Sequence, residues 1–159
     1  MNNVIVNIAD AKMSNCLDDI LVTYSLGSCI GVAVYDPEVK VGGMIHCMLP
    51  LSKVDPVKAE THPFMFVDCG VIRLLTMLFD QGLVRSRAIV KIAGCSQILD
   101  KGNLFRIGER NHTVLRKVLW KNGLMIKGEQ IGGNASRTMR LEIATGRCTI
   151  KSGGVEYEL

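Results

Sequence analysis

The sequence predicts an α+β or layered α/β fold, with mixed, mostly antiparallel sheets and two long helices. Short β-branched segments with alternating apolar residues recur along the chain, and two longer segments repeat their apolar residues at helical spacing. Strands and helices follow one another in mixed order, which is typical of layered folds. At 159 residues, the chain is expected to form one domain over residues 1–159 with a core that needs no metal or disulfide.

The first elements are expected to be strands. Alternating apolar residues predict strands over 4–8 and 20–24, whereas 11–19 is polar and is expected to be irregular. A hairpin should follow, with strands over 29–35 and 40–48. Its turn is placed at 36–39, because Pro presets φ and Asp favours such bends.

This hairpin decides how two reactive side chains meet. A turn at 36–39 places Tyr35 opposite Lys40 and, counting back, Cys29 opposite His46. Facing residues on antiparallel strands point to the same side with Cβ atoms about 5 Å apart. A slip of one residue would put the two side chains on opposite faces.

The remaining elements follow from periodicity, with Gly82 capping the first helix and Asn122-Gly123 ending the second. In order, we expect a connector over 51–63, a helix over 64–81, a strand over 87–92, a loop over 98–105, a helix over 107–121, a strand over 124–131, a tight loop over 132–137, a hairpin of 139–144 with 147–151, and a strand over 155–159.

A thiol after a glycine turn and an imidazole on the next strand are the two parts of a cysteine-nucleophile site. Cys29 follows Gly27 and Ser28, small residues that let a substrate approach and permit an anion-binding turn. Thr23, on the neighbouring strand, is placed to orient the imidazole of His46. The alternative is a buried thiol and a core histidine bonded to a carbonyl, since free cysteine is among the most buried residue types.

The other five cysteines are expected to be small core residues in a reducing compartment. Among the six cysteines there is no Cys-x-x-Cys pair and no Cys/His cluster with zinc spacing. His62 and His112 are expected at the surface. We therefore expect no metal and no organic cofactor.

The net charge of +4 is modest and spread along the chain. Basic residues within the second helix fit a solvated helix face, and no aromatic residues are interleaved to stack on bases, so nucleic acid is not an expected partner. An acidic protein partner is more plausible. No apolar run has the length of a membrane span, and the N-terminal residues do not form a signal peptide, so a cytoplasmic protein without membrane insertion is expected.

Several segments in a fixed order resemble the CheD family, the chemoreceptor glutamine deamidases of bacterial and archaeal chemotaxis. The similarity runs from near the N-terminus to about Lys151. The matching segments are Thr23-Tyr24-Ser25-Leu26-Gly27-Ser28-Cys29, Asp36-Pro37, Val41-Gly42-Gly43-Met44-Ile45-His46-Cys47-Met48-Leu49-Pro50, Lys91-Ile92-Ala93-Gly94, Ile107-Gly108-Glu109-Arg110-Asn111, and Gly132-Gly133-Asn134 with Arg137.

The resemblance implies a hydrolase that converts glutamine side chains of methyl-accepting chemotaxis receptors to glutamate. It implies a Cys-His-Thr triad at Cys29, His46 and Thr23, and a fold similar to the catalytic domain of toxin deamidases. It also raises a CheC-type phosphatase as a possible partner. The sequence departs from the family at Ser25, Cys95 and Ser136, where glycine is common.

The expected chemistry is attack by the Cys29 thiolate on the glutamine carboxamide, through a thioester. Pairing with an imidazolium can lower a cysteine pKa well below its free value of about 8.5. Backbone N–H groups around Gly27, Ser28 and Cys29 would hold the oxyanion. Two alternatives stay open: another thiol acyl-transfer enzyme, such as a protease or transglutaminase, and a non-catalytic adaptor that binds receptors or a CheC-type phosphatase.

Overall fold

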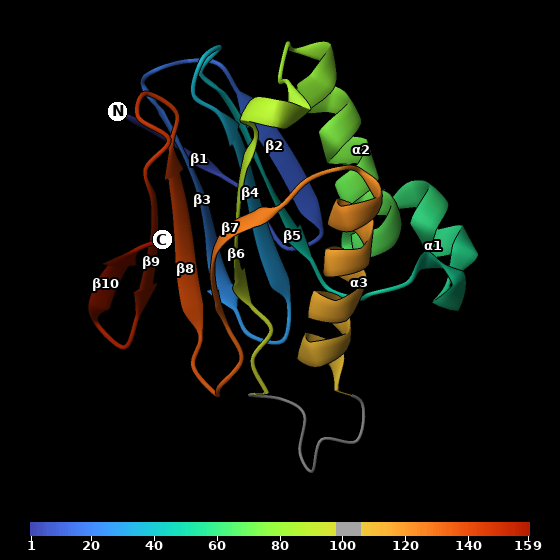
Figure 1. Cartoon of the computed structure of the whole chain (residues 1–159). Helices are drawn as coiled ribbons and strands as arrows, with labels where there is room; N and C mark the ends of the chain where they lie inside the picture. The colour runs from blue at the N-terminus through green and yellow to red at the C-terminus, as the bar shows by residue number, and fades with distance from the viewer. Residues whose placement is uncertain (98–105) are drawn as a thin grey trace.

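The protein is built from three layers, two β-sheets and one layer of helices, as seen in a computed structural model that describes residues 1–97 and 106–159. The first sheet lies on one side, the second sheet lies in the middle, and α2 and α3 cover the outer face of the second sheet (Figure 1). The predicted layered α+β class is confirmed.

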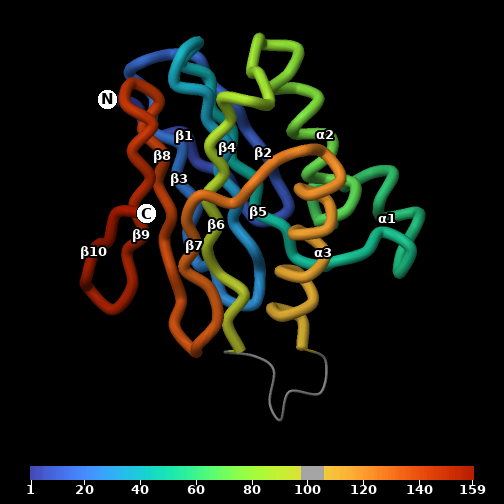
Figure 2. Tube along the Cα trace, viewed as in Figure 1, coloured from blue at the N-terminus to red at the C-terminus, as the bar shows by residue number. Residues whose placement is uncertain are grey.

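The outer sheet has the strand order β1-β3-β8-β9-β10. All neighbours are antiparallel except β1 and β3, which run parallel. The two termini lie on the same side of the molecule as this sheet (Figure 2), and the C-terminal Leu159 packs against the core between the two sheets. Its strands are β1 (Asn2–Ile5), β3 (Asp19–Leu26), β8 (Arg137–Glu142), β9 (Cys148–Ser152) and β10 (Val155–Glu158).

The middle sheet has the order β2-β5-β4-β6-β7 and is antiparallel except for the pair of β6 and β7. Every residue of its two central strands, β4 and β5, is buried, because helices pack on one face and the outer sheet packs on the other. Its strands are β2 (Asp10–Ser14), β4 (Ile30–Asp36), β5 (Val41–Cys47), β6 (Ile89–Gly94) and β7 (Ile126–Ile131).

Two long helices, α2 (Val67–Asp80) and α3 (Ile107–Lys121), were both expected from the sequence. Gly82 has a φ of 98°, so it caps the end of α2 in the left-handed region that favours glycine. The expected connector over 51–63 contains α1 (Pro56–Thr61), and short 3₁₀ turns complete the structure at η1 (Ser52–Val54), η2 (Pro63–Met65) and η3 (Arg85–Arg87). The loop expected over 98–105 lies outside the described residues.

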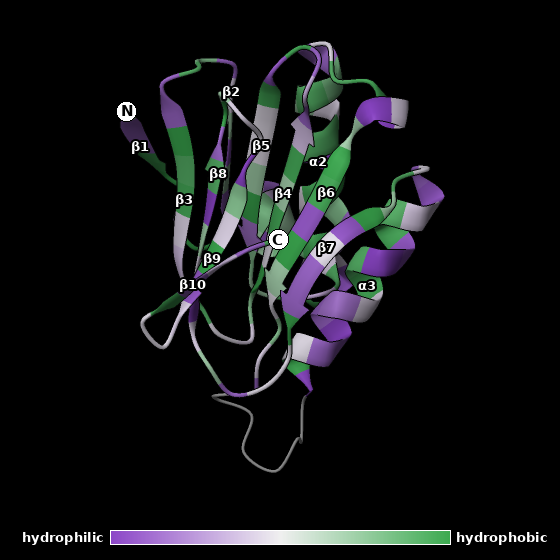
Figure 3. Ribbon diagram, turned by 60° about the vertical axis from the view of Figure 1, so that its left-hand side comes forward, coloured by the Kyte–Doolittle hydropathy of each residue, from purple (hydrophilic) through white to green (hydrophobic). Residues whose placement is uncertain are grey.

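Two apolar cores follow from this layering. One lies between the middle sheet and the helices and includes Val32, Ile45 and Leu74. The other lies between the two sheets and includes Leu21, Met44 and Met139. Figure 3 shows apolar colour concentrated on the central strands, whereas the outer face of α3 is hydrophilic. Alternate residues of β4 and β5 therefore enter different cores.

Three expectations about local structure were wrong. The segment over 11–19 is not irregular, because β2 occupies Asp10–Ser14 and pairs with β5. The first strand covers residues 2–5 instead of 4–8. Cys16 is exposed and Cys69 is half-buried, so only Cys47, Cys95 and Cys148 among the other five cysteines are buried.

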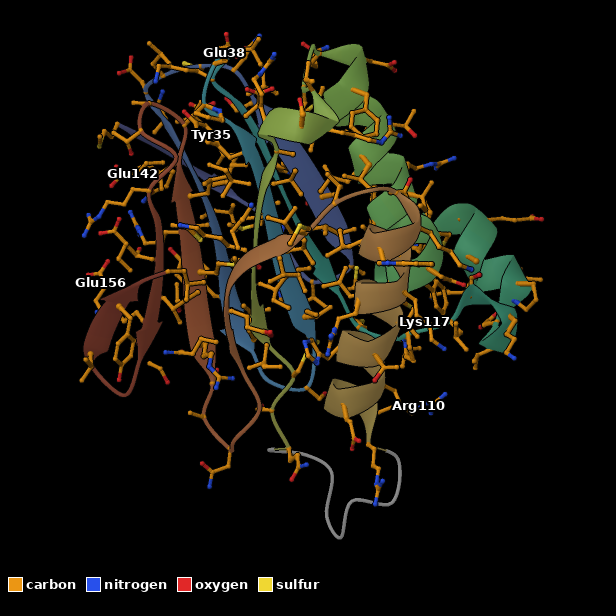
Figure 4. All side chains as sticks on the ribbon, viewed as in Figure 1. Tyr35, Glu38, Arg110, Lys117, Glu142 and Glu156 are labelled. Atoms are coloured by element: carbon orange, nitrogen blue, oxygen red, sulfur yellow. The ribbon has the colours of Figure 1, made fainter. Side chains whose placement is uncertain are left out.

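The turn between β4 and β5 is shifted by one residue from its expected place. Asp36 remains in β4, fully buried, and its carboxylate accepts from the backbone N–H groups of Glu38 and Val84 and from the Arg87 guanidinium. Arg87 and these amides hold the pKa of Asp36 at about 2, although burial opposes this. The turn therefore covers residues 37–40, at the opposite end of the molecule from Arg110 at the start of α3 (Figure 4, where Glu38 and Arg110 are labelled).

Candidate active site

The candidate thiol lies on the half-exposed turn of residues 27–29 that joins β3 to β4. The three carbonyl oxygens of this turn each accept a hydrogen bond: Gly27 from the Ser96 N–H at 2.9 Å, Ser28 from the Asn111 side chain at 3.0 Å, and Cys29 from the Cys95 N–H at 2.8 Å. The side chain of Cys29 packs against the core between the sheets. The thiol is therefore held on a braced turn and is not sealed in the interior.

The turn also has free donors. The backbone N–H groups of Ser28 and Cys29 donate to no acceptor within the described residues. The N–H of Cys29 lies beside its own sulfur, where it favours the charged form of the thiol. Unpaired amides next to a thiol are the donors that an oxyanion site requires.

His46 lies in β5 opposite Gly31, not opposite Cys29 as the sequence analysis expected. The cause is the one-residue shift of the turn, which changes every pair in the hairpin by two residues, so that Tyr35 faces Gly42 in place of Lys40. A two-residue change preserves the face of each side chain. Cys29 lies one residue before β4, and its side chain packs against the core between the sheets. Continuing the register by one residue places it opposite Met48, so Cys29 and His46 still share this face as diagonal neighbours.

Thr23 contacts His46 across the gap between the two sheets. Its Oγ1 lies 2.7 Å from Nδ1 of His46 and donates to the carbonyl oxygen of Val6, also at 2.7 Å. A threonine hydroxyl has one proton, so the bond to Val6 leaves it as the acceptor for Nδ1–H. Nε2 of the neutral imidazole therefore carries the lone pair.

Nε2 is buried and has no hydrogen-bond partner within the described residues. Burial lowers the pKa of His46 to about 4 and raises the pKa of the Cys29 thiol. The direction for Cys29 is opposite to the lowered pKa expected from an ion pair. At neutral pH the resting side chains are a thiol and a neutral imidazole, an arrangement suited to proton transfer during attack.

Neighbouring segments complete the surroundings of the turn. Arg137 is buried and donates to the carbonyl oxygens of Gly94 and Gly132, at 3.0 and 2.8 Å. The glycine-rich loop at 132–134 is thus tied to the end of β6. Within residues 1–97 and 106–159, no group of three or more His, Cys, Asp or Glu side chains is arranged to hold a metal ion.

His62 is exposed, as the sequence predicted, whereas His112 is partly buried beside Glu129, 3.1 Å away. In the part of the chain that the structure describes, none of the helices has the length and apolarity needed to cross a bilayer.

Comparison with known proteins now adds to this geometry. Residues 48–152 match the sequence model of the CheD family, described as CheD chemotactic sensory transduction. The chain belongs to the CheD family. It is 52% identical to the probable chemoreceptor glutamine deamidase CheD 1 of Syntrophus aciditrophicus, over 97% of this chain and 96% of that protein. It is 43% identical to the probable chemoreceptor glutamine deamidase CheD of Solibacter usitatus, over 100% of this chain and 94% of that protein.

Of the three positions at which the sequence analysis expected glycine in the family, two have a backbone conformation that favours glycine. Ser25 and Cys95 have φ values of 59° and 56°, in the left-handed region where glycine is favoured. Ser136 does not have a positive φ. Glycine at positions 25 and 95 would adopt the left-handed backbone conformation without strain. In this chain, Ser25 and Cys95 adopt it at the cost of strain.

Sequence reasoning missed Asn111 and Ser96 as parts of this region. Asn111 lies on the buried stripe of α3 with Gly108, Leu115 and Leu119. A polar residue within an apolar helical stripe was the available signal, because such a side chain must find hydrogen-bond partners in the interior. Ser96 follows β6 in an irregular segment, and no periodicity marked it.

Proposed function

We propose that this protein deamidates glutamine side chains of methyl-accepting chemotaxis receptors, with Cys29 as nucleophile, His46 as base and Thr23 as the residue that orients the imidazole. The observation that carries the proposal is the chain of hydrogen bonds from His46 through Thr23 to the carbonyl oxygen of Val6. It leaves Nε2 of His46, on the face that Cys29 shares, as an acceptor with no partner among residues 1–97 and 106–159. The relatives from Syntrophus aciditrophicus and Solibacter usitatus are named as probable chemoreceptor glutamine deamidases, which supports the substrate class.

The reaction begins with transfer of the thiol proton of Cys29 to Nε2 of His46 as sulfur attacks the carboxamide carbon. A carbon–sulfur bond forms and the carbonyl oxygen becomes an oxyanion, which the N–H groups at Ser28 and Cys29 would stabilise. Gly27 permits the close approach of substrate to this turn. The oxyanion collapses, the carbon–nitrogen bond breaks, and His46 returns its proton to the leaving ammonia.

Hydrolysis of the thioester completes the cycle. Water gives a proton to His46 as it attacks the thioester carbon, and collapse expels sulfur, which regains the proton. The net change is glutamine plus water to glutamate plus ammonia. Each conversion places a negative charge on the receptor, and no metal or organic cofactor has a step in this scheme.

The experiment that tests the proposal is incubation of the protein with a purified cytoplasmic receptor fragment, followed by peptide mass spectrometry. The wild-type protein and the matched thiol variant Cys16→Ser, whose thiol is exposed on another segment, should convert the same glutamines. Cys29→Ala should fold and convert none. Undiminished conversion by Cys29→Ala would rule out this nucleophile, and backbone cleavage or amine incorporation would assign another acyl-transfer reaction.

A non-catalytic adaptor is the second candidate, and two observations favour it. Burial raises the pKa of Cys29, and no hydrogen bond joins the thiol to His46 in the described residues. An adaptor would bind the receptor fragment, or a CheC-type phosphatase, without converting glutamine. Binding of the fragment by wild-type protein with no deamidated peptide would favour this function.

A further inference from the structure

Asn111 connects the segment that carries the thiol to the segment that carries the imidazole. It lies on α3 with none of its surface exposed. Its Nδ2 donates to the carbonyl oxygen of Ser28 at 3.0 Å and to that of Met48 at 3.2 Å. Ser28 precedes Cys29, and Met48 lies two residues after His46. A single amide group therefore bridges the two halves of the candidate site.

The orientation of this amide is fixed by its partners. Both are backbone carbonyls, which only accept, so the amino group of Asn111 must face them. Oδ1 is left buried, with no hydrogen-bond partner in the described parts of the chain. Leaving a buried acceptor unpaired costs stability. The arrangement thus keeps the bridge between the two segments at the expense of an unpaired oxygen.

A glycine sets how closely α3 approaches the turn. A Cβ atom at Gly108 would lie 2.5 Å from the carbonyl oxygen of Cys95 and 2.8 Å from that of Ser96. Gly108 and Asn111 are three residues apart and share one helix face. The Cys95 N–H in turn donates to the carbonyl oxygen of Cys29. The close approach at Gly108 therefore allows the Asn111 side chain to reach the thiol-bearing turn.

The separation of the two reactive groups depends on such a brace. Continuing the hairpin register by one residue beyond Ile30 makes Cys29 and His46 diagonal neighbours, and diagonal neighbours are about 7–8 Å apart, with their Cβ atoms somewhat closer. At that separation, whether the sulfur of Cys29 can reach Nε2 of His46 depends on the relative position of the turn that carries the thiol and the strand that carries the imidazole. A substitution away from the reacting groups that misplaces them by about 1 Å can lower the reaction rate on the order of 100-fold.

We infer that Asn111 is a positioning residue for the deamidation proposed above: it holds the Cys29 turn and the end of β5 at the separation from which the thiol passes its proton to Nε2. The inference rests on the proposed function, because it assigns a role in the same reaction. It adds a residue of α3, which carries none of the three proposed reactive side chains.

The test uses Asn111→Asp, which keeps the shape but sets carboxylate oxygens against two carbonyls, and Gly108→Ala, which displaces the helix. The kcat and KM for a receptor fragment are measured, together with the rate at which iodoacetamide modifies Cys29 across pH, followed by peptide mass spectrometry. We expect kcat to fall on the order of 100-fold, KM to change little, and alkylation near neutral pH to slow.

Leu119→Ala is the matched control, since Leu119 is buried on the same helix two turns further on. It should lower the melting temperature while leaving kcat and the alkylation profile unchanged. A folded Asn111→Asp or Gly108→Ala protein with wild-type kcat and alkylation overturns the inference. The inference is also overturned if the fall in kcat of these variants is no larger than that of Leu119→Ala at equal stability.

The same data separate this inference from the proposed function. If Asn111→Asp does not fold, Asn111→Ser and Gly108→Ala provide the same comparison. If the wild-type protein deamidates no glutamine, or if Cys29→Ala still deamidates the fragment, the proposed function or its nucleophile fails, whereas the alkylation profiles still report whether Asn111 sets the reactivity of the thiol. If Cys29→Ala is inactive and the Asn111 and Gly108 variants match wild type, only the positioning role fails.

Discussion

Acid should destabilise this protein through His46. Burial lowers the pKa of this imidazole from 6.5 to about 4 in the folded protein. In the unfolded chain the imidazole is in water and has its ordinary pKa, so the unfolded state takes up the proton first as the pH falls. The contribution of the neutral, buried imidazole to the unfolding free energy is therefore fully present above about pH 6.5. It is lost progressively as the pH falls towards about 4.

The size of the effect follows from these two values. The difference between 6.5 and about 4 corresponds to about 3 kcal/mol of unfolding free energy in total. Integration between pH 7 and pH 5 gives a loss of about 2 kcal/mol. That loss is a large fraction of the ~5–15 kcal/mol that stabilises a typical domain.

Urea unfolding at pH 7, 6 and 5 measures this loss directly. His46→Gln serves as the reference, because its amide does not titrate while every other titratable group remains. The wild-type protein should lose about 2 kcal/mol more than His46→Gln between pH 7 and pH 5. Equal losses in the two proteins would refute the reasoning, since they would mean that the buried imidazole is protonated as readily as a solvated one.

Four further substitutions, one of them a control, test other parts of the structure. Thr23→Val removes the acceptor for Nδ1–H of His46 and should cost about 1–3 kcal/mol in urea unfolding, because a buried donor is left unpaired, and it should lower kcat for a receptor fragment. Ser25→Gly should raise the melting temperature by relieving a left-handed φ, whereas Ser136→Gly, which lacks a positive φ, should not. Arg87→Met should lower the unfolding free energy measured in urea at pH 7, because a buried carboxylate in β4 loses its cation; an unchanged value would show that the backbone amides suffice.

Most element types could be predicted from local pattern, because burial on one face imposes a period of two on strands and 3.6 on helices. The helix over 107–121 has the predicted bounds. The strand at Asp10–Ser14 was missed because it lies at the edge of the middle sheet and buries only Ala11 fully. A strand with so few buried residues has no alternating apolar pattern, and its pairing with β5 is a tertiary effect.

The brace at Asn111 could not be predicted for a different reason. Its partners, the carbonyl groups of Ser28 and Met48, lie 83 and 63 residues away in sequence. Backbone carbonyls are present at every position, so the sequence does not mark which of them a buried amide will meet. The sequence indicated only that a polar residue interrupts an apolar stripe, which requires partners without naming them.

The hairpin register shows what a strand pattern determines and what it leaves to the turn. The alternation of apolar residues assigned Cys29 and His46 to one face, and this held because a shift of two residues preserves face. The distance between them depended on where the turn begins, and that was set by Asp36, whose carboxylate binds Arg87 from a segment far along the chain. Face was thus a local property of the two strands, whereas separation was a property of the assembled protein. The same division explains why the candidate site needs Thr23 from the other sheet and a brace from α3: strand pattern placed the reactive side chains on one face, and contacts between layers determine whether they can react.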